Sequence, residues 1–498
     1  LFTITVVLQL IACNPNSQST QKESYKINCG SCHIPPSIED LPKGIWKEEI
    51  LPNMAARMGL KINDYNPYKG LTYEEMEATI NSGIYSTKPI LSAEDWIALE
   101  AYILDNAPDS LPKIAYPEFK SLDGFISRTI ALDSTPGAMY TYLGFDEESG
   151  QVLTGGIDGR LMGYNYVTKE VSTVGTYERP IVDYTNKGDR SFVTEIGKLD
   201  PTQLRTGRLI QSGAEESIVL LDKLQRPVHT LVYDLDNDGM DEYVVSEFGD
   251  LRGQLSLFER NSEGSYDKTM LLGQPGTIRV IAHDMNGDGK TDLVAQTSQG
   301  DESITILTQK DSLKFTAKQA IRFSPVYGSS WFELAEYDGD GDQDIITVNG
   351  DNADKSYVHK PYHGLRIHIN QGDNVFEEKY FFPMNGSTRL LSGDFDQDGD
   401  LDFFVVAIFP NYDQDPLPSL VYLENEDAET FRFTPRIKEG TPEGRWFLLT
   451  SGDIDADGDE DVVVSSFTYA LTPIPEALSE KWNQSRTDLL ILENTFGE

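Results

Sequence analysis

The residues with the clearest chemical signature lie near the start of the chain, in the stretch NCGSCH (Asn28–His33). Cys29 and Cys32 stand three residues apart, and His33 directly follows the second cysteine. This CxxCH spacing is the attachment signature of c-type haem, whose vinyl groups take up the two thiols while the imidazole binds the iron. We therefore predict one haem c, held by Cys29 and Cys32, with His33 as an axial ligand. The alternative is a disulfide or a thioredoxin-like dithiol, but that motif stands beside a βαβ pattern, and the neighbourhood here is helical.

The iron of such a haem needs a sixth ligand, normally Met or His. The first two of the six histidines are His33 and His229, so a methionine from the same segment is favoured. The candidates are Met54, Met58 and Met76. A methionine on a helix usually packs in a core, and the residues alone leave the choice open.

A second set of residues repeats five times in the later part of the chain. The copies are DLDNDGMDE, DMNGDGKTD, EYDGDGDQD, DFDQDGDLD and DIDADGDED, which begin at residues 234, 284, 336, 394 and 453. Carboxylates at alternate positions of a tight loop can converge on one point, and the glycine permits the turn. This spacing suits Ca²⁺, and we predict about five ions. The predicted ligands are Asp234, Asp236, Asp238, Glu242, Asp284, Asn286, Asp288, Asp292, Glu336, Asp338, Asp340, Asp344, Asp394, Asp396, Asp398, Asp402, Asp453, Asp455, Asp457 and Asp461.

An EF-hand and acidic turns without metal are the two alternatives to this calcium site. An EF-hand opens with similar spacing, but it needs a glutamate at position twelve and flanking helices. In all five copies, position twelve lies in a strand-like run instead. The residues at this position are Val245, Ala295, Thr347, Val405 and Val464. Acidic turns without metal are the other alternative, but five such loops in register would repel themselves without cations. A sixth, degraded copy begins at Asp183 and has Lys187 at a ligand position, so no ion is expected there.

The segments around these loops predict a repeat architecture. HTLVY and TIRVIAH precede the first two loops, YVVSEF and LVAQT follow them, and GQLSLFER and SITILTQ complete the units. With the degraded copy and a weaker one in residues 139–165, the chain holds seven units of about four strands each. Seven such sheets around an axis form a β-propeller. We therefore predict an all-β seven-bladed propeller over residues 125–498.

Residues 25–112 are patterned as helices instead. WKEEILPNMAARM has apolar residues at four-residue spacing, and Pro52 should begin or disturb its second half. TYEEMEATINSGIY is a second helix, and SAEDWIALEAYIL is a third, which opens with Ser92 and Asp95 in capping-box spacing. The fold class is thus multidomain, with a small all-α domain followed by the propeller.

The chain opens with the apolar run LFTITVVLQLIAC, which is too short to span a bilayer and is typical of a secretory signal. LIAC resembles the lipobox of bacterial lipoproteins, in which the cysteine, here Cys13, is lipidated. Residues 1–13 are therefore predicted as a signal and 14–24 as a polar tether, and the alternative is a buried strand. We expect a lipid-anchored protein of the bacterial cell envelope, on the periplasmic or surface face of the outer membrane. The net charge of -40 argues against a nucleic-acid partner.

The acidic repeats resemble the FG-GAP or VCBS repeats of integrin-like propellers, in which Ca²⁺ is mainly structural. The whole chain resembles a group of bacterial proteins that join a small cytochrome c-like domain to such repeats. The stretches that carry this resemblance are WKEEILPNMAARMGL, GDNADKSYVHKPYHGLRIHIN, QGDESITIL and VVAIFPNYDQD. It implies that Met54 is the distal haem ligand, with Met58 second, and that EDWIALEAYIL is a closing cytochrome helix packed on the first helix. It implies no settled activity.

A further group of residues lies five positions before each acidic loop, near the start of the innermost strands. These residues are Glu178, His229, Arg279, Trp331 and Arg389. Equivalent positions in a propeller form a ring around the axis, so they could bind an anionic ligand at the channel mouth. Solvated polar strand ends are the alternative. His359 and His363 could be metal ligands, part of a docking loop, or ordinary loop residues.

The predicted function follows from the haem. GxSxG, HExxH and Walker sequences are absent, which disfavours catalysis by those mechanisms. We predict an electron-transfer lipoprotein whose propeller docks a redox partner or an outer-membrane complex. The alternatives are a binding or structural subunit with an incidental haem, and an oxidoreductase with its site at the channel mouth.

Overall fold

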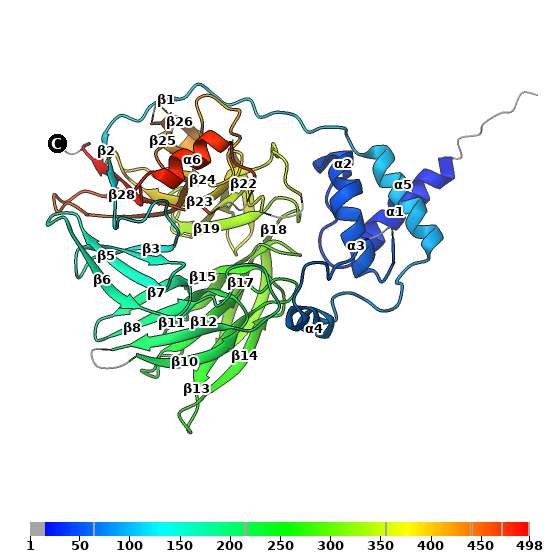
Figure 1. The fold of residues 1–498 in the computed structure, drawn as a ribbon, viewed down its shortest axis with the longest axis horizontal. Helices are drawn as coiled ribbons and strands as arrows, with labels where there is room; N and C mark the ends of the chain where they lie inside the picture. Colours follow the sequence, from blue (N-terminus) through cyan, green and yellow to red (C-terminus); the bar gives the residue numbers. More distant parts are fainter. Residues whose placement is uncertain are drawn as a thin grey trace, which may run out of the picture.

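The computed structural model describes residues 15–62, 65–213, 217–353, 356–438, 440, 442–469 and 472–496. Helices near the N-terminus form one unit, and the remaining residues form a ring of small sheets (Figure 1). Cys13, the predicted lipidation site, lies outside the described residues. Over the described ranges, no helix combines the length and the apolar character needed to cross a bilayer.

The N-terminal helical unit contains five α-helices and two short helical turns. They are α1 (Pro15–Cys29), η1 (Ile38–Asp40), α2 (Lys43–Ile45), the π-helical turn η2 (Trp46–Ile50), α3 (Leu51–Arg57), α4 (Tyr73–Ser82) and α5 (Ala93–Asn106). The expectation of a tether over residues 14–24 is corrected here, because α1 already begins at Pro15. Proline suits the first turn of a helix, and no other breaker follows it before Cys29.

The starts of the later helices follow the sequence signals. Thr72 accepts a hydrogen bond from the Glu75 backbone N–H, and the Glu75 carboxylate accepts one from the Thr72 backbone N–H, so a capping box begins α4. Ser92 caps α5 through the backbone N–H of Asp95. Pro52 lies in the first turn of α3, directly after η2, where its missing N–H costs no hydrogen bond.

The helices enclose a core of their own. Trp46 from η2, Leu51 from α3 and Leu99 from α5 are almost fully buried in it. Helices α1 and α5 pack against each other, as the sequence predicted for the closing helix. The unit therefore has the apolar interior that a small domain needs to fold.

The propeller has seven sheets, and in blades one to five the strands follow one another in space as they do in sequence. Blades one to four are β3 (Tyr140–Asp146), β4 (Gln151–Gly156), β5 (Arg160–Asn165), β6 (Glu170–Thr176); β7 (Ile181–Lys187), β8 (Arg190–Glu195), β9 (Gly207–Ser212), β10 (Ser217–Leu224); β11 (Pro227–Tyr233), β12 (Glu242–Glu247), β13 (Gln254–Arg260), β14 (Tyr266–Leu272); and β15 (Thr277–His283), β16 (Asp292–Thr297), β17 (Ser303–Asp311), β18 (Lys314–Arg322). Blade five is β19 (Ser329–Ala335), β20 (Asp344–Asn349), β21 (Gly364–Asn370) and β22 (Phe376–Pro383). The seven-bladed propeller predicted from the repeats is confirmed.

The last two blades take strands from both ends of the propeller. Blade six is β23 (Ser387–Gly393), β24 (Asp402–Ala407), β25 (Leu420–Asp427) and β26 (Arg432–Ile437), with β1 (Lys120–Ser121) parallel to β26. Blade seven is β27 (Trp446–Gly452), β28 (Asp461–Ser466) and β29 (Leu489–Asn494), and helix α6 (Glu476–Gln484) precedes β29. Its outermost strand is β2 (Phe125–Ile130), which runs antiparallel to β29. The ring is therefore closed by pairing the first full strand with the last one.

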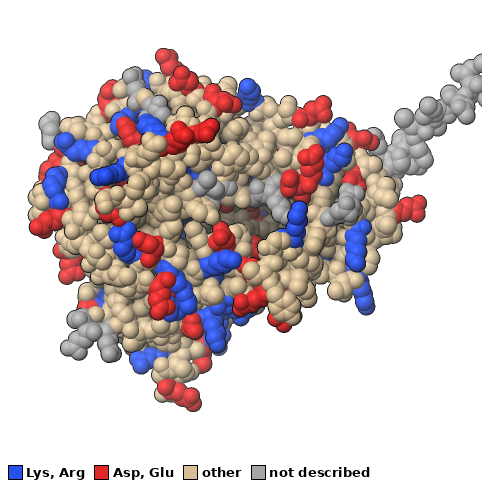
Figure 2. All heavy atoms as spheres, in the orientation of Figure 1, with Lys and Arg blue, Asp and Glu red and all other residues tan. Residues whose placement is uncertain are grey.

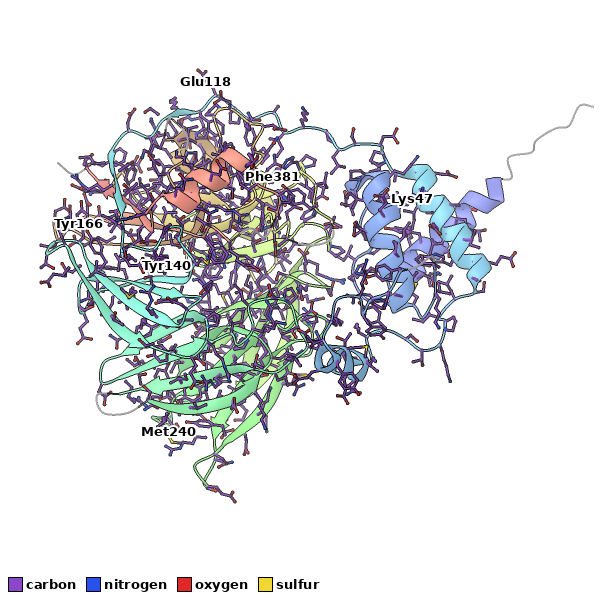
Figure 3. All side chains as sticks on the ribbon, viewed as in Figure 1. Lys47, Glu118, Tyr140, Tyr166, Met240 and Phe381 are labelled. Atoms are coloured by element: carbon purple, nitrogen blue, oxygen red, sulfur yellow. The ribbon has the colours of Figure 1, made fainter. Side chains whose placement is uncertain are left out.

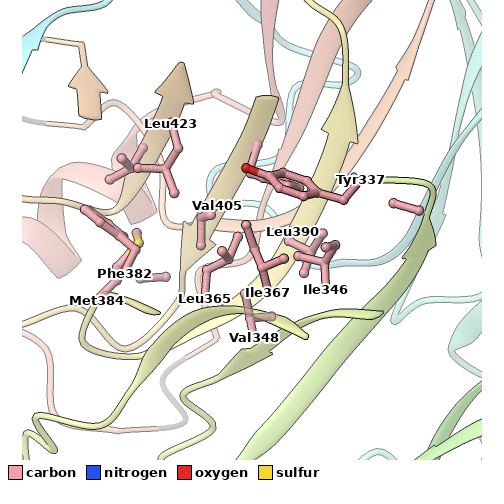
Figure 4. Packing of buried hydrophobic residues seen from close by; sticks show 14 of the residues in the cluster. Tyr337, Ile346, Val348, Leu365, Ile367, Phe382, Met384, Leu390, Val405 and Leu423 are labelled. Atoms are coloured by element: carbon pink, nitrogen blue, oxygen red, sulfur yellow. The ribbon is translucent and has the colours of Figure 1, made fainter. Parts of the chain in front are cut away.

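The propeller core lies between neighbouring blades. Every residue of the second strands β12, β16, β20, β24 and β28 is buried, since each has a sheet on both sides. Between blades five and six, Ile346, Ile367 and Val405 belong to one apolar cluster (Figure 4). Strands buried on both faces read as continuous apolar runs, which is why IITVN and FFVVAIF are so hydrophobic.

The helical domain covers one face of the propeller. Its contacts come from the loops β8–β9, β12–β13, β18–β19 and β20–β21, which in an antiparallel blade lie at the end where the innermost strand begins. Tyr362 Oη donates to the Asp40 carbonyl at 2.7 Å, and Arg252 Nε donates to the Ser82 carbonyl at 2.9 Å. The acidic loops, at the other end of the innermost strands, face away. In Figure 3, Met240 of one such loop lies far from Lys47 of the helical domain.

Candidate functional site

The two cysteines of NCGSCH lie where helix α1 ends. Cys29 is the last residue of α1 and is half-buried, whereas Cys32 is exposed, and neither forms a disulfide among the described residues. Burial raises the pKa of the Cys29 thiol to about 11, so this thiol is protonated at neutral pH. The pair thus offers one sulfur at the edge of the helical core and one in solvent.

His33 is oriented by its own backbone neighbour. Its Nδ1 lies 2.9 Å from the carbonyl oxygen of Ile34. When Nδ1 carries the proton and donates to this carbonyl, Nε2 keeps its lone pair for a metal. Metal-binding histidines are commonly oriented by such a second hydrogen bond, so the imidazole fits the role of an axial ligand.

The predicted distal ligands reach the same apolar cluster as the first cysteine. Cys29, Met54 and Met58 are all partly buried against the core that contains Trp46 and Leu99. The structure therefore brings both methionine candidates to the cluster and leaves the choice between them open. Met76, on α4, is not part of this cluster.

Three polar atoms near this cluster are buried without a hydrogen-bond partner. They are Asn53 Oδ1, Arg57 Nε and Trp96 Nε1. Buried polar groups normally have partners, and two of these three are donors that could serve the propionates of a haem. The residues present thus fit the group: Cys29 and Cys32 would hold the porphyrin, His33 and a methionine the iron, and Arg57 a carboxylate.

The acidic loops bring their first carboxylates together. In blades five, six and seven, the oxygens at positions one, three and five lie within 4.8 Å of one another. In blade three the group is Asp234, Asp236 and Glu242. In blade four, Asp284 accepts hydrogen bonds from the backbone of Asp288 and Gly289, which keeps its carboxylate over the loop. Hard oxygens gathered in this way suit Ca²⁺.

The structure adds a ligand candidate that the sequence interpretation missed. Position seven is an aspartate in blades five, six and seven, namely Asp342, Asp400 and Asp459, and one carboxylate oxygen of each is buried without a partner. Burial and the neighbouring carboxylates raise the pKa of each to about 6. A cation in the loop would relieve both effects. The sequence DGD in these three copies could have indicated this ligand, because blades three and four have Met240 and Lys290 at position seven.

The predicted ligands at position nine already have a structural role. Asp292, Asp344, Asp402 and Asp461 are essentially fully buried. One oxygen of each accepts a backbone N–H from the third strand or the residue after it, as Asp461 Oδ1 does from Asn494 at 2.8 Å. These carboxylates tie the loop to its blade whether or not a metal is bound.

The degraded copy in blade two is not a loop of this kind. Asp183 lies within β7, which runs on to Lys187, and Lys187 pairs directly with Arg190 of β8. The connection is a tight hairpin turn. Lys187 Nζ forms an ion pair with Asp241 of the next blade at 2.6 Å.

The strand register places four of the five predicted ring residues at equivalent positions, and one is corrected. After a β-bulge near the start of each innermost strand, His229, Arg279, Trp331 and Arg389 occupy equivalent positions. In blade two this position belongs to Asp183. Glu178 precedes the strand, with its side chain 77% exposed. Counting back from Asp183 was wrong because the hairpin is shorter than the other loops.

The ring joins half-buried charges to aromatic rings. The Arg279 and Arg389 guanidiniums lie 4.2 and 4.5 Å from the centre of the Trp331 ring. Asp183 accepts a hydrogen bond from the Thr230 backbone N–H, and burial raises the pKa of this carboxyl. Burial also lowers the pKa of His229, so its imidazole is neutral.

His359 and His363 lie in the β20–β21 loop that contacts the helical domain. His363 is fully buried, and burial lowers its pKa well below the usual range. Neither histidine belongs to a group of metal-ligating side chains among the described residues. Tyr362, beside His363, donates to the Asp40 carbonyl of the helical domain, so this loop serves the contact between domains.

Comparison with known proteins identifies the repeats. Residues 234–295, 284–347 and 394–464 match the family model of the FG-GAP-like repeat, and these stretches contain all five acidic loops. No curated protein matches the chain. The N-terminal domain of Nup159 is similar with a TM-score of 0.43 at 11% identity, over 76% of this chain and 98% of that one. The S. cerevisiae complex of Dbp5 with Nup159, Gle1, IP6 and ADP gives a TM-score of 0.42 at 10% identity, with the same coverage. Similarity at this level says nothing about function.

FG-GAP-like repeats arranged as a seven-bladed propeller suggest a binding or structural role. Such repeats commonly mediate contacts between proteins, which is consistent with a protein partner. On the face seen in Figure 2, basic and acidic side chains are interspersed.

Proposed function

We propose that the protein carries one covalent haem c on its N-terminal helices and transfers single electrons, while the propeller docks a partner. The observation that carries the proposal concerns Cys29, His33 and Met54. The first and last contact one apolar cluster, and the imidazole is held by Ile34 so that Nε2 can bind a metal. When bound, the haem would supply one-electron redox chemistry, with a potential raised by methionine ligation.

The residues around the haem have separate tasks in this proposal. Cys29 and Cys32 fix the porphyrin at the end of α1, and the core around Trp46 excludes water from one side of it. Exclusion of water favours the less charged state of an iron centre and so supports a high potential. Exposed Cys32 marks the edge at which a redox partner would approach.

The propeller would hold this haem domain at its partner or at an outer-membrane complex. About five Ca²⁺ ions would stiffen the acidic loops, on the face opposite the helical domain. A lipid on Cys13 would tether the protein to the bacterial cell envelope.

An optical redox titration tests electron transfer. The full chain, produced with a c-type cytochrome maturation system, should show one reversible one-electron transition and should exchange electrons with a soluble cytochrome. A haem that is bound but not reducible within the range of cellular carriers would instead favour a binding subunit with an incidental haem.

A further inference from the structure

Two guanidiniums share one indole at the axis of the propeller. Arg279 comes from blade four, Trp331 from blade five and Arg389 from blade six. The two cations lie 4.2 and 4.5 Å from the same ring. Cation–π attraction favours each contact alone, but two positive charges on one ring repel each other. The arrangement therefore favours an anion that interacts with both.

The charges around this pair are only partly balanced. Arg279 has the Glu333 carboxylate at 3.9 Å, a long contact, and Glu333 Oε2 is engaged by the backbone N–H and the hydroxyl of Ser392. Arg389 donates to the carbonyl oxygens of Ser330 and Thr388 and forms no ion pair with a carboxylate of the described residues. Arg389 is thus without an ion-pair partner among the described residues, although the carboxyl of Asp183 acts electrostatically on Arg279 and that of Asp351 on Arg389.

Water reaches this part of the axis. The side chains of Arg279 and Glu333 keep exposures of 23% and 16%, although both stand on innermost strands. His229, which occupies the same ring, has its Nδ1 buried without a partner. A small molecule at this level would therefore meet the two guanidiniums, the indole of Trp331 and the carboxylate of Glu333.

We propose that Arg279, Trp331 and Arg389 form a binding site for a small planar oxyanion of the carboxylate type. A guanidinium is planar and presents paired N–H donors, which match the two oxygens of a carboxylate. Arg389 supplies the guanidinium that has no ion-pair partner among the described residues, and Glu333 limits affinity by competing for Arg279. The site is separate from the haem proposal and does not depend on it.

Acetate and nitrate are the probes, titrated into the full chain by calorimetry at constant ionic strength maintained with chloride. We expect saturable binding by the native protein, at least tenfold weaker binding by Arg389→Gln, and tighter binding by Glu333→Gln. Arg432→Gln is the matched control, because Arg432 lies on an outer strand with 64% exposure, and its affinity should equal that of the native protein.

Three outcomes would overturn the proposal. They are no saturable binding of either anion by the native protein, a loss of affinity in Arg432→Gln equal to that in Arg389→Gln, and unchanged affinity in both Arg389→Gln and Glu333→Gln. Circular dichroism checks that each variant is folded. If Arg389→Gln does not fold, the affinity of Glu333→Gln decides. Tighter anion binding by this variant would show that the Glu333 carboxylate competes with the anion, which a carboxylate with only a structural role would not do. Haem content of the same samples, measured by absorbance, shows separately whether the proposed electron-transfer function holds.

Discussion

Met54 and Met58 lie four residues apart and contact the same apolar cluster as Cys29. Met54 is within α3, whereas Met58 is the residue at which that helix ends. A ligand within a helix is held by its hydrogen bonds on both sides, and a terminal residue is held less firmly. This difference favours Met54 as the distal ligand and agrees with what the family resemblance implies.

Substitution of each methionine by leucine separates the two. We expect Met54→Leu to lower the reduction potential of the haem, because loss of a thioether ligand removes the stabilisation of ferrous iron. Met58→Leu is the matched control and should leave the potential near the native value, measured by optical redox titration. A fall with Met58→Leu alone would assign the ligand to Met58.

Glu302 is a buried carboxyl far from the loops and the haem motif. The backbone N–H and hydroxyl of Ser329 donate to its Oε2 at 2.9 and 2.7 Å. Burial nevertheless raises its pKa from 4.5 to about 8. The protonated form is therefore favoured in the folded state, and the contribution to stability that is present below pH 4.5 is lost as the pH rises through about 8.

Glu302→Gln should remove this part of the pH dependence. We expect the native midpoint of urea unfolding to fall between pH 5 and pH 8.5 more steeply than that of the variant, because glutamine has no proton to lose. Glu263→Gln, on an exposed turn, serves as control. Parallel pH profiles for the native protein and Glu302→Gln would contradict the assignment.

At the scale of elements, each acidic loop joins the first and second strands of a blade. The carboxylates at positions one, three and five converge in blades five, six and seven, and those at position nine are bonded to the third strand. A cation in such a loop would thus connect three strands of one blade. Its loss should loosen a blade rather than a single turn.

Asp340→Asn tests one of these loops. We expect the variant to hold one calcium ion fewer per chain than the native protein after dialysis against calcium, because the fifth-position carboxylate is lost from the group. The free energy of unfolding in calcium should fall by ~1–3 kcal/mol. The calcium content per chain is measured by elemental mass spectrometry. Asp311→Asn, on the β17–β18 turn, should retain the native content, and an equal content in both variants would refute the site.

Sequence signals that act within a few residues predicted most of the helices and strands. A position inferred by counting residues back from an assumed loop was wrong. Ser92 and the repeated DxDxDG loops act within a few residues, so a helix start and seven blades could be predicted. Glu178 was misplaced because the hairpin after β7 is shorter than a loop. Residues 14–24 were expected as a tether because of their polar composition, whereas α1 begins at Pro15 and its Tyr25 is buried in the helical core. The buried oxygens of Asp342 and its equivalents depend on packing that only the folded blade reveals.

At the scale of the whole molecule, the two domains meet through a small set of contacts. Lys198 pairs with Glu75 of α4 at 2.5 Å, and Tyr362 bonds the Asp40 carbonyl. Val326, at the start of blade five, is buried in the core of the helical domain. The propeller thereby completes a core that the helices alone leave open, and it fixes the orientation of the proposed haem.

Removal of Tyr362 should weaken this contact. Tyr362→Ala loses both the hydrogen bond and the stack on Tyr327, at a cost of ~2 kcal/mol. After cleavage of the linker in residues 109–119, we expect the two fragments of the native chain to co-elute in gel filtration and those of the variant to separate. Tyr233→Ala, at the opposite end of an innermost strand, should behave as the native protein does. Co-elution of the Tyr362→Ala fragments would show that other contacts suffice.

The most direct test of the central claim is the mass of the intact, denatured protein after production with a c-type cytochrome maturation system. Covalent attachment at Cys29 and Cys32 predicts a mass increase of one haem, which remains after acid and organic solvent and disappears when both cysteines are replaced by alanine. A chain at its unmodified mass, or a haem that solvent extracts, would contradict the account.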